Sequence, residues 1–117
     1  METRGKKPHI NEIKVFHKND TVFIPISEII RFEGKINNSL IVTNSGRKYL
    51  SSYSLKYFQL FLSSSTFCRV HKSHLINKNR IKKFCLEEGK HKIEFPNGEK
   101  VDISRRMLKM VMEIVKT

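Results

Sequence analysis

Short segments in which apolar and polar residues alternate recur about every ten residues along the chain. They cover residues 13–16, 21–26, 29–33, 40–42, 47–50, 67–70, 81–86, 93–95 and 101–103. A period of two is typical of strands with one buried face, and in residues 29–33 it places Ile30 and Phe32 together. Asn97-Gly98 predicts a tight hairpin between the last two segments, because both residues accept a positive φ. The pattern therefore predicts a mostly β fold.

Helical spacing interrupts this pattern at two places. Ser54 is a predicted N-cap for a short helix that buries Leu55, Phe58, Phe61 and Leu62. Ser104 is a predicted N-cap for a C-terminal helix with a wide apolar face, made of Met107, Leu108, Val111, Met112, Ile114 and Val115. A face that wide predicts that the last helix packs on the sheet.

The 117 residues suit one domain, with residues 1–10 as a basic tail and residues 11–117 as the domain. Lys and Arg number 23 against 11 Asp and Glu, which gives a net charge of +12. Such a surplus costs stability by self-repulsion, so it indicates a polyanionic partner. The chain has neither an apolar run of about 18 residues nor a secretory signal, and we therefore expect a cytoplasmic protein with no membrane partner.

Motifs for catalysis and for metal binding are missing. There is no glycine-rich phosphate loop, no Gly-x-Ser-x-Gly and no His-Glu-x-x-His, so we expect neither an enzyme nor a cofactor. Cys68 and Cys85 lie in strand patterns and are predicted to be buried free thiols. With His71 and His74 they could offer four zinc ligands. However, Cys85 stands alone where a second close pair is expected, and we predict no metal.

Two basic segments remain as candidate nucleic-acid contacts. Residues 67–83 contain six Lys or Arg and no acid, and these cations suit phosphates, with Ser73, Asn77 and Asn79 adding neutral hydrogen bonds. Arg105 and Arg106 fall in the first turn of the predicted last helix. Cations there are unfavourable by up to about 1 kcal/mol, which indicates a functional reason for their presence.

Four segments together resemble the LytTR family of bacterial DNA-binding domains. They are FIPISEIIRFEG (23–34), SLKYFQLFL (54–62), FCRVHKSHLINKNRI (67–81) and NGEKVDISRR (97–106). The third segment matches the family's Arg-x-His-x-Ser-x-x-x-Asn signature with Arg69, His71, Ser73 and Asn77. The resemblance runs from about residue 13 to residue 115. It implies an elongated β-sandwich of about ten short strands, with a short middle helix and a C-terminal helix.

The resemblance also implies how DNA is read. Loops rather than a recognition helix enter successive major grooves, and the base contacts carry over to Asn38, Lys72 and Arg105. His71 and Asn77 are implied to support the loop that presents Lys72. We expect phosphate contacts from a wider set: Lys35, Asn37, Ser39, Arg69, Ser73, Lys78, Arg80, Lys82 and Arg106. Asn37 or Ser39 could also take the base-reading role of Asn38.

In the family these domains serve transcription regulation in two-component response regulators. The resemblance therefore implies double-stranded promoter DNA with paired direct repeats as the partner, and dimerisation on DNA. It also implies a receiver domain outside this chain, and the alternative is a module that stands alone with a short basic tail. We further expect the surplus positive charge to lie on the same edge as Lys72 and Arg105. An RNA-binding module, with Tyr49, Tyr53 and Tyr57 exposed for stacking, and a basic protein-interaction domain are the alternatives.

Overall fold

A computed structural model describes residues 11–116 of the chain and the side chains of residues 11–113. The predicted basic tail, residues 1–10, lies outside the described residues, as do the side chains of Ile114 and Val115 on the predicted apolar helix face. The described part is an elongated domain measuring 44 × 37 × 25 Å. None of its helices is long and apolar enough to cross a membrane.

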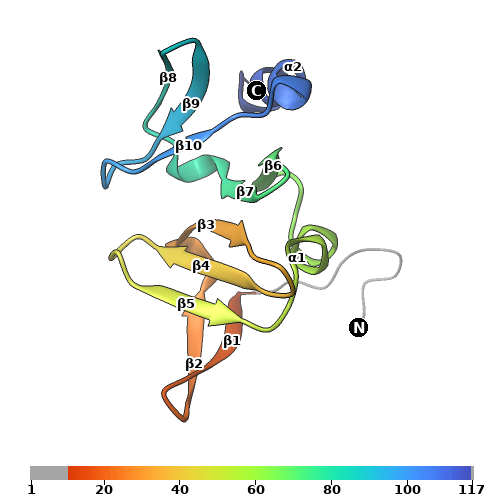
Figure 1. Ribbon diagram of the computed structural model, residues 1–117. Coiled ribbons are helices and arrows are strands. Elements are labelled where there is room, and N and C mark those ends of the chain that lie inside the picture. The colour runs from red at the N-terminus through yellow and green to blue at the C-terminus, as the bar shows by residue number, and fades with distance from the viewer. Residues whose placement is uncertain (1–10, 117) are drawn as a thin grey trace, which may run out of the picture.

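Ten strands and two α-helices make up the described part of the chain, and their arrangement confirms the predicted mostly β fold (Figure 1). The strands are β1 (Glu12–His17), β2 (Asp20–Pro25), β3 (Ile29–Gly34), β4 (Ser39–Thr43), β5 (Lys48–Ser51), β6 (Phe67–His71), β7 (His74–Asn77), β8 (Lys83–Glu87), β9 (Lys90–Glu94) and β10 (Lys100–Asp102). The helices are α1 (Leu55–Phe61) and α2 (Leu108–Lys116).

The strands form three antiparallel sheets. A five-stranded sheet with the order β5-β4-β3-β7-β6 lies in the middle of the molecule. Figure 1 shows the β1–β2 hairpin on one side of it and the β8–β9–β10 sheet with α2 on the other. The middle sheet is therefore covered on both faces, which explains why the first four residues of its central strand β3, Ile29–Phe32, are all buried.

Two hydrophobic cores fill the spaces between these layers. The first joins β1, β2 and α1 to one face of the middle sheet, with Phe32, Phe58 and Leu75 among its most buried side chains. The second joins the three-stranded sheet and α2 to the other face, around Ile76 and Phe95. Strands β3, β6 and β7 contribute to both cores.

The prediction that Ile30 and Phe32 share a face is wrong. Ile30 packs in the second core and Phe32 in the first. The register of β3 against β4 shifts between Ile29 and Arg31, as at a β-bulge. An extra residue at a bulge reverses the alternation of faces, and the sequence of β3 carries no signature of this irregularity.

Strand β7 falls in the stretch that we treated only as basic. It is short, and Leu75 and Ile76 are buried in opposite cores, so its sequence HLIN shows no alternation. A brief apolar run between charged residues gives too weak a periodic signal for a strand buried on both faces.

The hairpin at Asn97-Gly98 forms, but with a different turn from the one predicted. Only Gly98 has a positive φ, of 90°, and its N–H donates to Phe95 O at 2.9 Å. Pro96 explains the difference, because a proline ring fixes φ near −65° and favours a turn centred one residue earlier. The turns with positive φ at both positions are Lys18-Asn19 and Glu88-Gly89.

Helix α1 begins as predicted, with the Ser54 hydroxyl accepting a hydrogen bond from the Tyr57 N–H at 3.2 Å. Phe61, expected in the core, is instead 39% exposed and stacks on Tyr57. The C-terminal helix starts later than predicted. Residues Arg105–Met107 form a 3₁₀ turn, Ser104 makes no side-chain capping bond, and α2 begins at Leu108. Val111 is fully buried against the second core, as a helix packed on the sheet requires.

Candidate nucleic-acid interface

The turn between β3 and β4 presents polar side chains at one edge of the middle sheet. The Lys35 N–H donates to Asn38 O at 2.9 Å and closes the turn. Lys35 and Asn37 are exposed, and Asn38 is half-buried. Of the four predicted contact residues of this loop, the geometry thus displays Lys35 and Asn37 fully and Asn38 in part.

Ser39 does not belong with them, and its predicted phosphate contact is corrected. Its side chain is 0% exposed, and its hydroxyl donates to Tyr53 O at 2.8 Å. Ser39 is the first residue of β4, and its side chain points into the domain. Its hydrogen bond holds the segment before α1 against this strand. A phosphate on the surface has no access to that hydroxyl.

The turn between β6 and β7 presents Lys72, which is exposed at its tip. His71 Nδ1 accepts a hydrogen bond from the Ser73 N–H at 3.0 Å, which fixes the shape of the turn. Arg69 holds it from beneath: Nε donates to His71 O at 3.0 Å, Nη1 to Gln59 Oε1 at 2.6 Å, and Nη2 to Lys72 O. The geometry gives Arg69 a part in supporting this loop, beside His71, that the sequence analysis did not assign to it.

Asn77 lies at the other end of β7, away from Lys72. Its side chain is buried, and Nδ2 donates to Ile29 O at 2.9 Å while Oδ1 accepts from the Asn79 N–H at 2.9 Å. Asn77 therefore joins β7 to β3 and caps the turn at Lys78–Arg80. The loop of Lys72 depends on it only through the placement of β7.

A third segment, the corner before α2, carries Arg105 and Arg106. Both side chains are exposed on the 3₁₀ turn. The corner is fixed in place by the Ser104 N–H, which donates to Val70 O in β6 at 2.8 Å. The backbone thus brings the Arg105 corner next to the strand that leads into the Lys72 turn.

These three segments form one continuous row. The Gly34 N–H donates to Ser73 O at 2.8 Å and joins the β3–β4 turn to the β6–β7 turn, as the Ser104–Val70 bond joins the β6–β7 hairpin to the corner. We call residues 34–38, 71–73 and 104–106 the loop edge. Gly34 lies close to both the β6–β7 turn and α1, because an added Cβ would lie 3.8 Å from Ser73 Cα and 3.0 Å from Leu55 Cδ1. The loop edge brings together Asn38, Lys72 and Arg105.

Three predicted phosphate contacts lie elsewhere. Lys78, Arg80 and Lys82 follow the far end of β7, about 15 Å from the Lys72 turn at ~3.3 Å per strand residue. The Arg80 guanidinium donates to Ser27 O, and Lys82 pairs with Glu94 at 3.9 Å. The expectation that the positive charge gathers on a single edge is therefore wrong for these residues. The topology of a β-hairpin separates its two ends, whereas in the sequence they are only a few residues apart.

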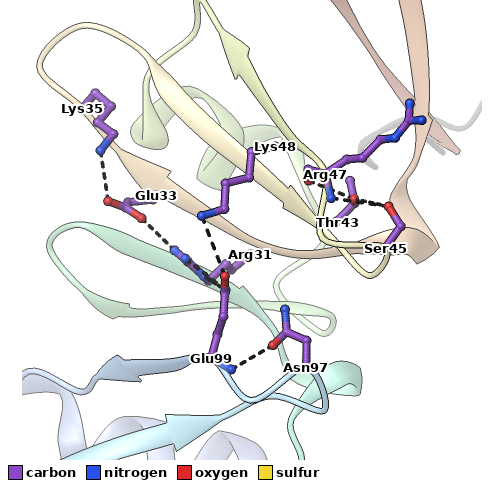
Figure 2. A network of polar contacts seen from close by, with 9 residues as sticks. All are labelled: Arg31, Glu33, Lys35, Thr43, Ser45, Arg47, Lys48, Asn97 and Glu99. Carbon is purple, nitrogen blue, oxygen red and sulfur yellow. Dashed lines mark hydrogen bonds and ion pairs between the residues drawn. The ribbon is translucent and has the colours of Figure 1, made fainter.

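An ion-pair network lies beside the loop edge and connects the middle sheet to the β9–β10 turn (Figure 2). Arg31, only 7% exposed, donates to Glu33 at 3.0 Å and to Glu99 at 3.2 Å. Glu33 also accepts from Lys35 Nζ at 3.1 Å, and Lys48 approaches Glu99 at 3.9 Å. The Arg31 hydrogen bond, helped by Lys35, holds the pKa of Glu33 below its usual value. Glu33 is thus a fixed anion next to the β3–β4 turn.

His74 is a buried base beneath the same turn. Burial, reinforced by the nearby charge of Arg31, lowers the pKa of its imidazole to about 4. Its Nδ1 has no hydrogen-bond partner in the structure, and its ring lies 5.2 Å from that of His71. The ring is therefore neutral at neutral pH.

The four side chains weighed for zinc do not converge. Cys68 is buried in the second core, where burial raises the pKa of its thiol, and Cys85 is a half-buried free cysteine on β8. Cys85 was predicted to be buried. It is only half-buried because it lies on β8, the outer strand of its sheet, which has a neighbouring strand on one side only. Among the described residues, no group of three or more His, Cys, Asp or Glu is arranged to hold a metal ion.

Two residues of the β8–β9 hairpin, Lys90 and His91, escaped the sequence analysis. They line a hollow of about 220 Å³ together with His71, Ser104 and Arg105. The sequence signal that could have identified Lys90 is the pair Glu88-Gly89, which suits a two-residue hairpin turn. A residue that directly follows such a turn lies at the end of its sheet.

Comparisons with known proteins agree with this geometry. The family model described as the LytTr DNA-binding domain matches residues 19–116. Two relatives, heme-containing CO-sensing transcriptional regulators RcoM 1 and RcoM 2 of Paraburkholderia xenovorans (strain LB400), are each 39% identical over 66 residues. Each match covers 56% of this chain but 24% of the relative, so the chain matches about a quarter of those proteins.

A solved structure has the same fold. It is the LytTr DNA-binding domain of a putative methyl-accepting/DNA response regulator from Bacillus cereus, 20% identical, with a TM-score of 0.83. The match covers 93% of this chain and 100% of that one. Since the family model also spans most of the sequence, this chain belongs to the LytTr DNA-binding domain family.

Proposed function

We propose that this chain binds duplex DNA sequence-specifically through the loop edge and thereby regulates transcription. The observation that carries the proposal is the alignment of three polar segments by the Gly34–Ser73 and Ser104–Val70 main-chain bonds. Backbone bonds fix the relative positions of the segments before DNA arrives, so little ordering entropy remains to oppose binding. The exposed cations of the row then face the phosphates.

Base reading falls to one side chain from each segment. Arg105 suits guanine, whose O6 and N7 accept two hydrogen bonds from a guanidinium, and Asn38 suits adenine N6 and N7. Lys72 stands between them at the tip of its turn. Lys35, Asn37, Ser73 and Arg106 supply neighbouring phosphate contacts. The loops take the part that a recognition helix plays in other folds.

The wider setting is part of the same proposal. The relatives are named as transcriptional regulators and the solved domain as part of a response regulator. We propose a cytoplasmic, non-enzymatic role on promoter DNA with paired direct repeats. A pair of sites would place two copies side by side, and a receiver domain outside this chain would control them in a two-component system.

Selection of bound duplexes from a random pool tests the proposal. We expect enrichment of a short motif, repeated in direct orientation. The selected duplex should bind at least about 10³-fold more tightly than a scrambled one at physiological salt. The affinity should also fall steeply between roughly 50 and 200 mM salt. A pool without enrichment, together with no duplex binding at low salt, would contradict the proposal.

A single-stranded RNA partner is the second candidate, favoured by exposed aromatic rings on and before α1. Tyr53 and Tyr57 stack with centroids 4.2 Å apart, and Phe61 continues the stack at 5.3 Å. These rings already cover one another, which leaves fewer free faces for bases, and Tyr49 is buried in the first core. Competition of unlabelled single-stranded RNA against a bound duplex separates the two candidates. Efficient displacement by RNA would favour the second.

A further inference from the structure

A hollow lies between the Lys72 turn and the Arg105 corner. Its volume is about 220 Å³, several times the ~30 Å³ that one water occupies in the liquid. Its lining comes from His71 at the end of β6, residues 89–91 of the β8–β9 hairpin, residues 102–105, and Leu108 at the start of α2. It is therefore large enough for a phosphate group with bridging water.

The walls of the hollow are fixed by backbone bonds. The Ile103 N–H donates to His91 O at 2.9 Å, and the Ser104 N–H donates to Val70 O at 2.8 Å. Lys90 follows a two-residue turn in which Glu88 and Gly89 have φ values of 52° and 78° and Glu87 pairs with Lys90. Both hydrogen bonds and the turn are part of the sheet framework, so Lys90 and Arg105 start from well-defined positions around the hollow.

The electrostatics of the hollow favour an anion. Lys90 and Arg105 are exposed cations on its rim. The one acid among its lining residues, Asp102, accepts a hydrogen bond from Lys92 Nζ at 2.6 Å, and that bond holds the pKa of its carboxyl low. Because His71 Nδ1 accepts a hydrogen bond, the other ring nitrogen carries a proton and can donate.

We propose that this hollow seats one phosphate of the DNA backbone, with Lys90 as its main cation. The inference rests on the proposed function, because the DNA must lie along the loop edge. Residues 34–38 and 104–106 stand at the two ends of that edge. If they enter successive major grooves, the surface between them faces the sugar-phosphate strands that separate the grooves. Lys90 thus fixes the register of the duplex, while Arg105 and Asn38 read bases.

The test replaces Lys90 with glutamine and uses Lys83→Gln as the matched control. Lys83 is an exposed lysine of the same three-stranded sheet, at the opposite end of β8 from the Lys90 turn. The probe is the selected duplex and a series in which single phosphates are replaced by neutral methylphosphonates. Binding is measured by fluorescence anisotropy at several salt concentrations, and circular dichroism melting checks that each variant folds.

For the wild type, we expect affinity to fall about 5- to 10-fold at one particular neutralised phosphate. Lys90→Gln should lose about the same factor on the unmodified duplex, lose the response at that phosphate, and flatten the salt slope by about one unit. Lys83→Gln should match the wild type. If folded Lys90→Gln binds as the wild type does, or keeps the full response at every phosphate, the phosphate seat is overturned. A wild type that binds no duplex overturns the proposed function instead.

Discussion

Arg105 stands at the end of the loop edge on a 3₁₀ turn held by the Ser104–Val70 backbone bond. Because the corner is fixed, replacing the side chain should remove a contact without moving the loop. We expect Arg105→Ala to cost about 1–3 kcal/mol of binding free energy and to abolish discrimination at one base pair. Affinities for a panel of singly substituted duplexes measure both effects.

The control for this variant is Arg47→Ala, an exposed arginine beyond the β4–β5 turn, at the opposite end of the middle sheet. It removes the same charge from the molecule. Arg47→Ala should therefore keep the full base preference. Equal losses from both variants would mean that Arg105 contributes only general charge.

For Glu33 we predict that a substitution strengthens DNA binding, whereas Arg105→Ala weakens it. Its carboxylate accepts from Lys35 Nζ at 3.1 Å and so competes with a phosphate for that cation (Figure 2). We expect Glu33→Gln to bind the selected duplex about 2- to 5-fold more tightly at low salt, because a repulsive anion beside the DNA is removed. The effect should shrink as salt rises.

Glu99→Gln is the matched control, since Glu99 also pairs with Arg31 but accepts no hydrogen bond from Lys35. It should leave DNA affinity near the wild-type value. A Glu33→Gln variant that binds more weakly than Glu99→Gln would show that Glu33 orients Lys35 for DNA rather than restraining it.

At the scale of elements, the β6–β7 hairpin carries a pH dependence. Burial lowers the pKa of His74 to about 4, whereas an unfolded histidine titrates near 6.5. Between these values the unfolded chain binds more protons, so this contribution to stability is complete above pH 6.5 and is lost as the pH falls toward 4. Because His74 is only partly buried, we expect a loss of about 1–2 kcal/mol.

Urea unfolding of the wild type and His74→Gln at several pH values between 6.5 and 5 measures this contribution. The variant lacks the titrating ring, so its free energy of unfolding should depend less on pH over that interval. Arg31, Glu33, His71 and Asp102 are the charged or titratable groups near His74, and they remain in both proteins. Parallel pH profiles would contradict the assignment to His74.

Elements with a regular period were predictable, and the exceptions have physical causes. The spacing of Leu55, Phe58 and Leu62 predicted α1, because a helix that packs on a core buries a residue every three to four positions along one face. The bulge in β3 and the short strand β7 were not predictable. Strands β3 and β7 are buried on both faces, so they lack the alternation of apolar and polar residues that marks a strand with one buried face.

The candidate site was predictable to the extent that a motif marks its loops. Asn38, Lys72 and Arg105 lie on one edge, and their role as base contacts stays a prediction. Ser39 and Arg80 show the limit of the approach, because the sequence does not tell whether a polar side chain meets solvent or a backbone carbonyl. Lys90 shows the converse, since its partners in the hollow come from β6 and from the corner before α2, which are distant in sequence.

At the scale of the whole molecule, the net charge of +12 is shared between the loop edge and other surfaces. Only the cations near DNA release its counterions, so salt dependence reports position rather than total charge. We expect Lys35→Ala to reduce the slope of log affinity against log salt by about one unit. Lys78→Ala, at the far end of β7, should leave the slope unchanged, although it removes the same charge.

Anisotropy titrations of both variants at matched salt concentrations make this comparison. The two lysines were equivalent members of the basic set in the sequence, so a difference between them tests the three-dimensional placement alone. A slope that falls equally for both would indicate that DNA wraps over the far end of the hairpin.

The strands β3, β6 and β7 lie between the two hydrophobic cores and supply side chains to each. If the elements around either core unfolded, one face of these three strands would be exposed to solvent. The other core needs the same strands, so it would lose its support as well. We therefore expect the protein to denature in a single step, with the fluorescence of its tyrosines and the circular dichroism of its backbone changing at the same urea concentration. A chain cut between residues 62 and 67 would then yield two fragments, neither of which folds by itself.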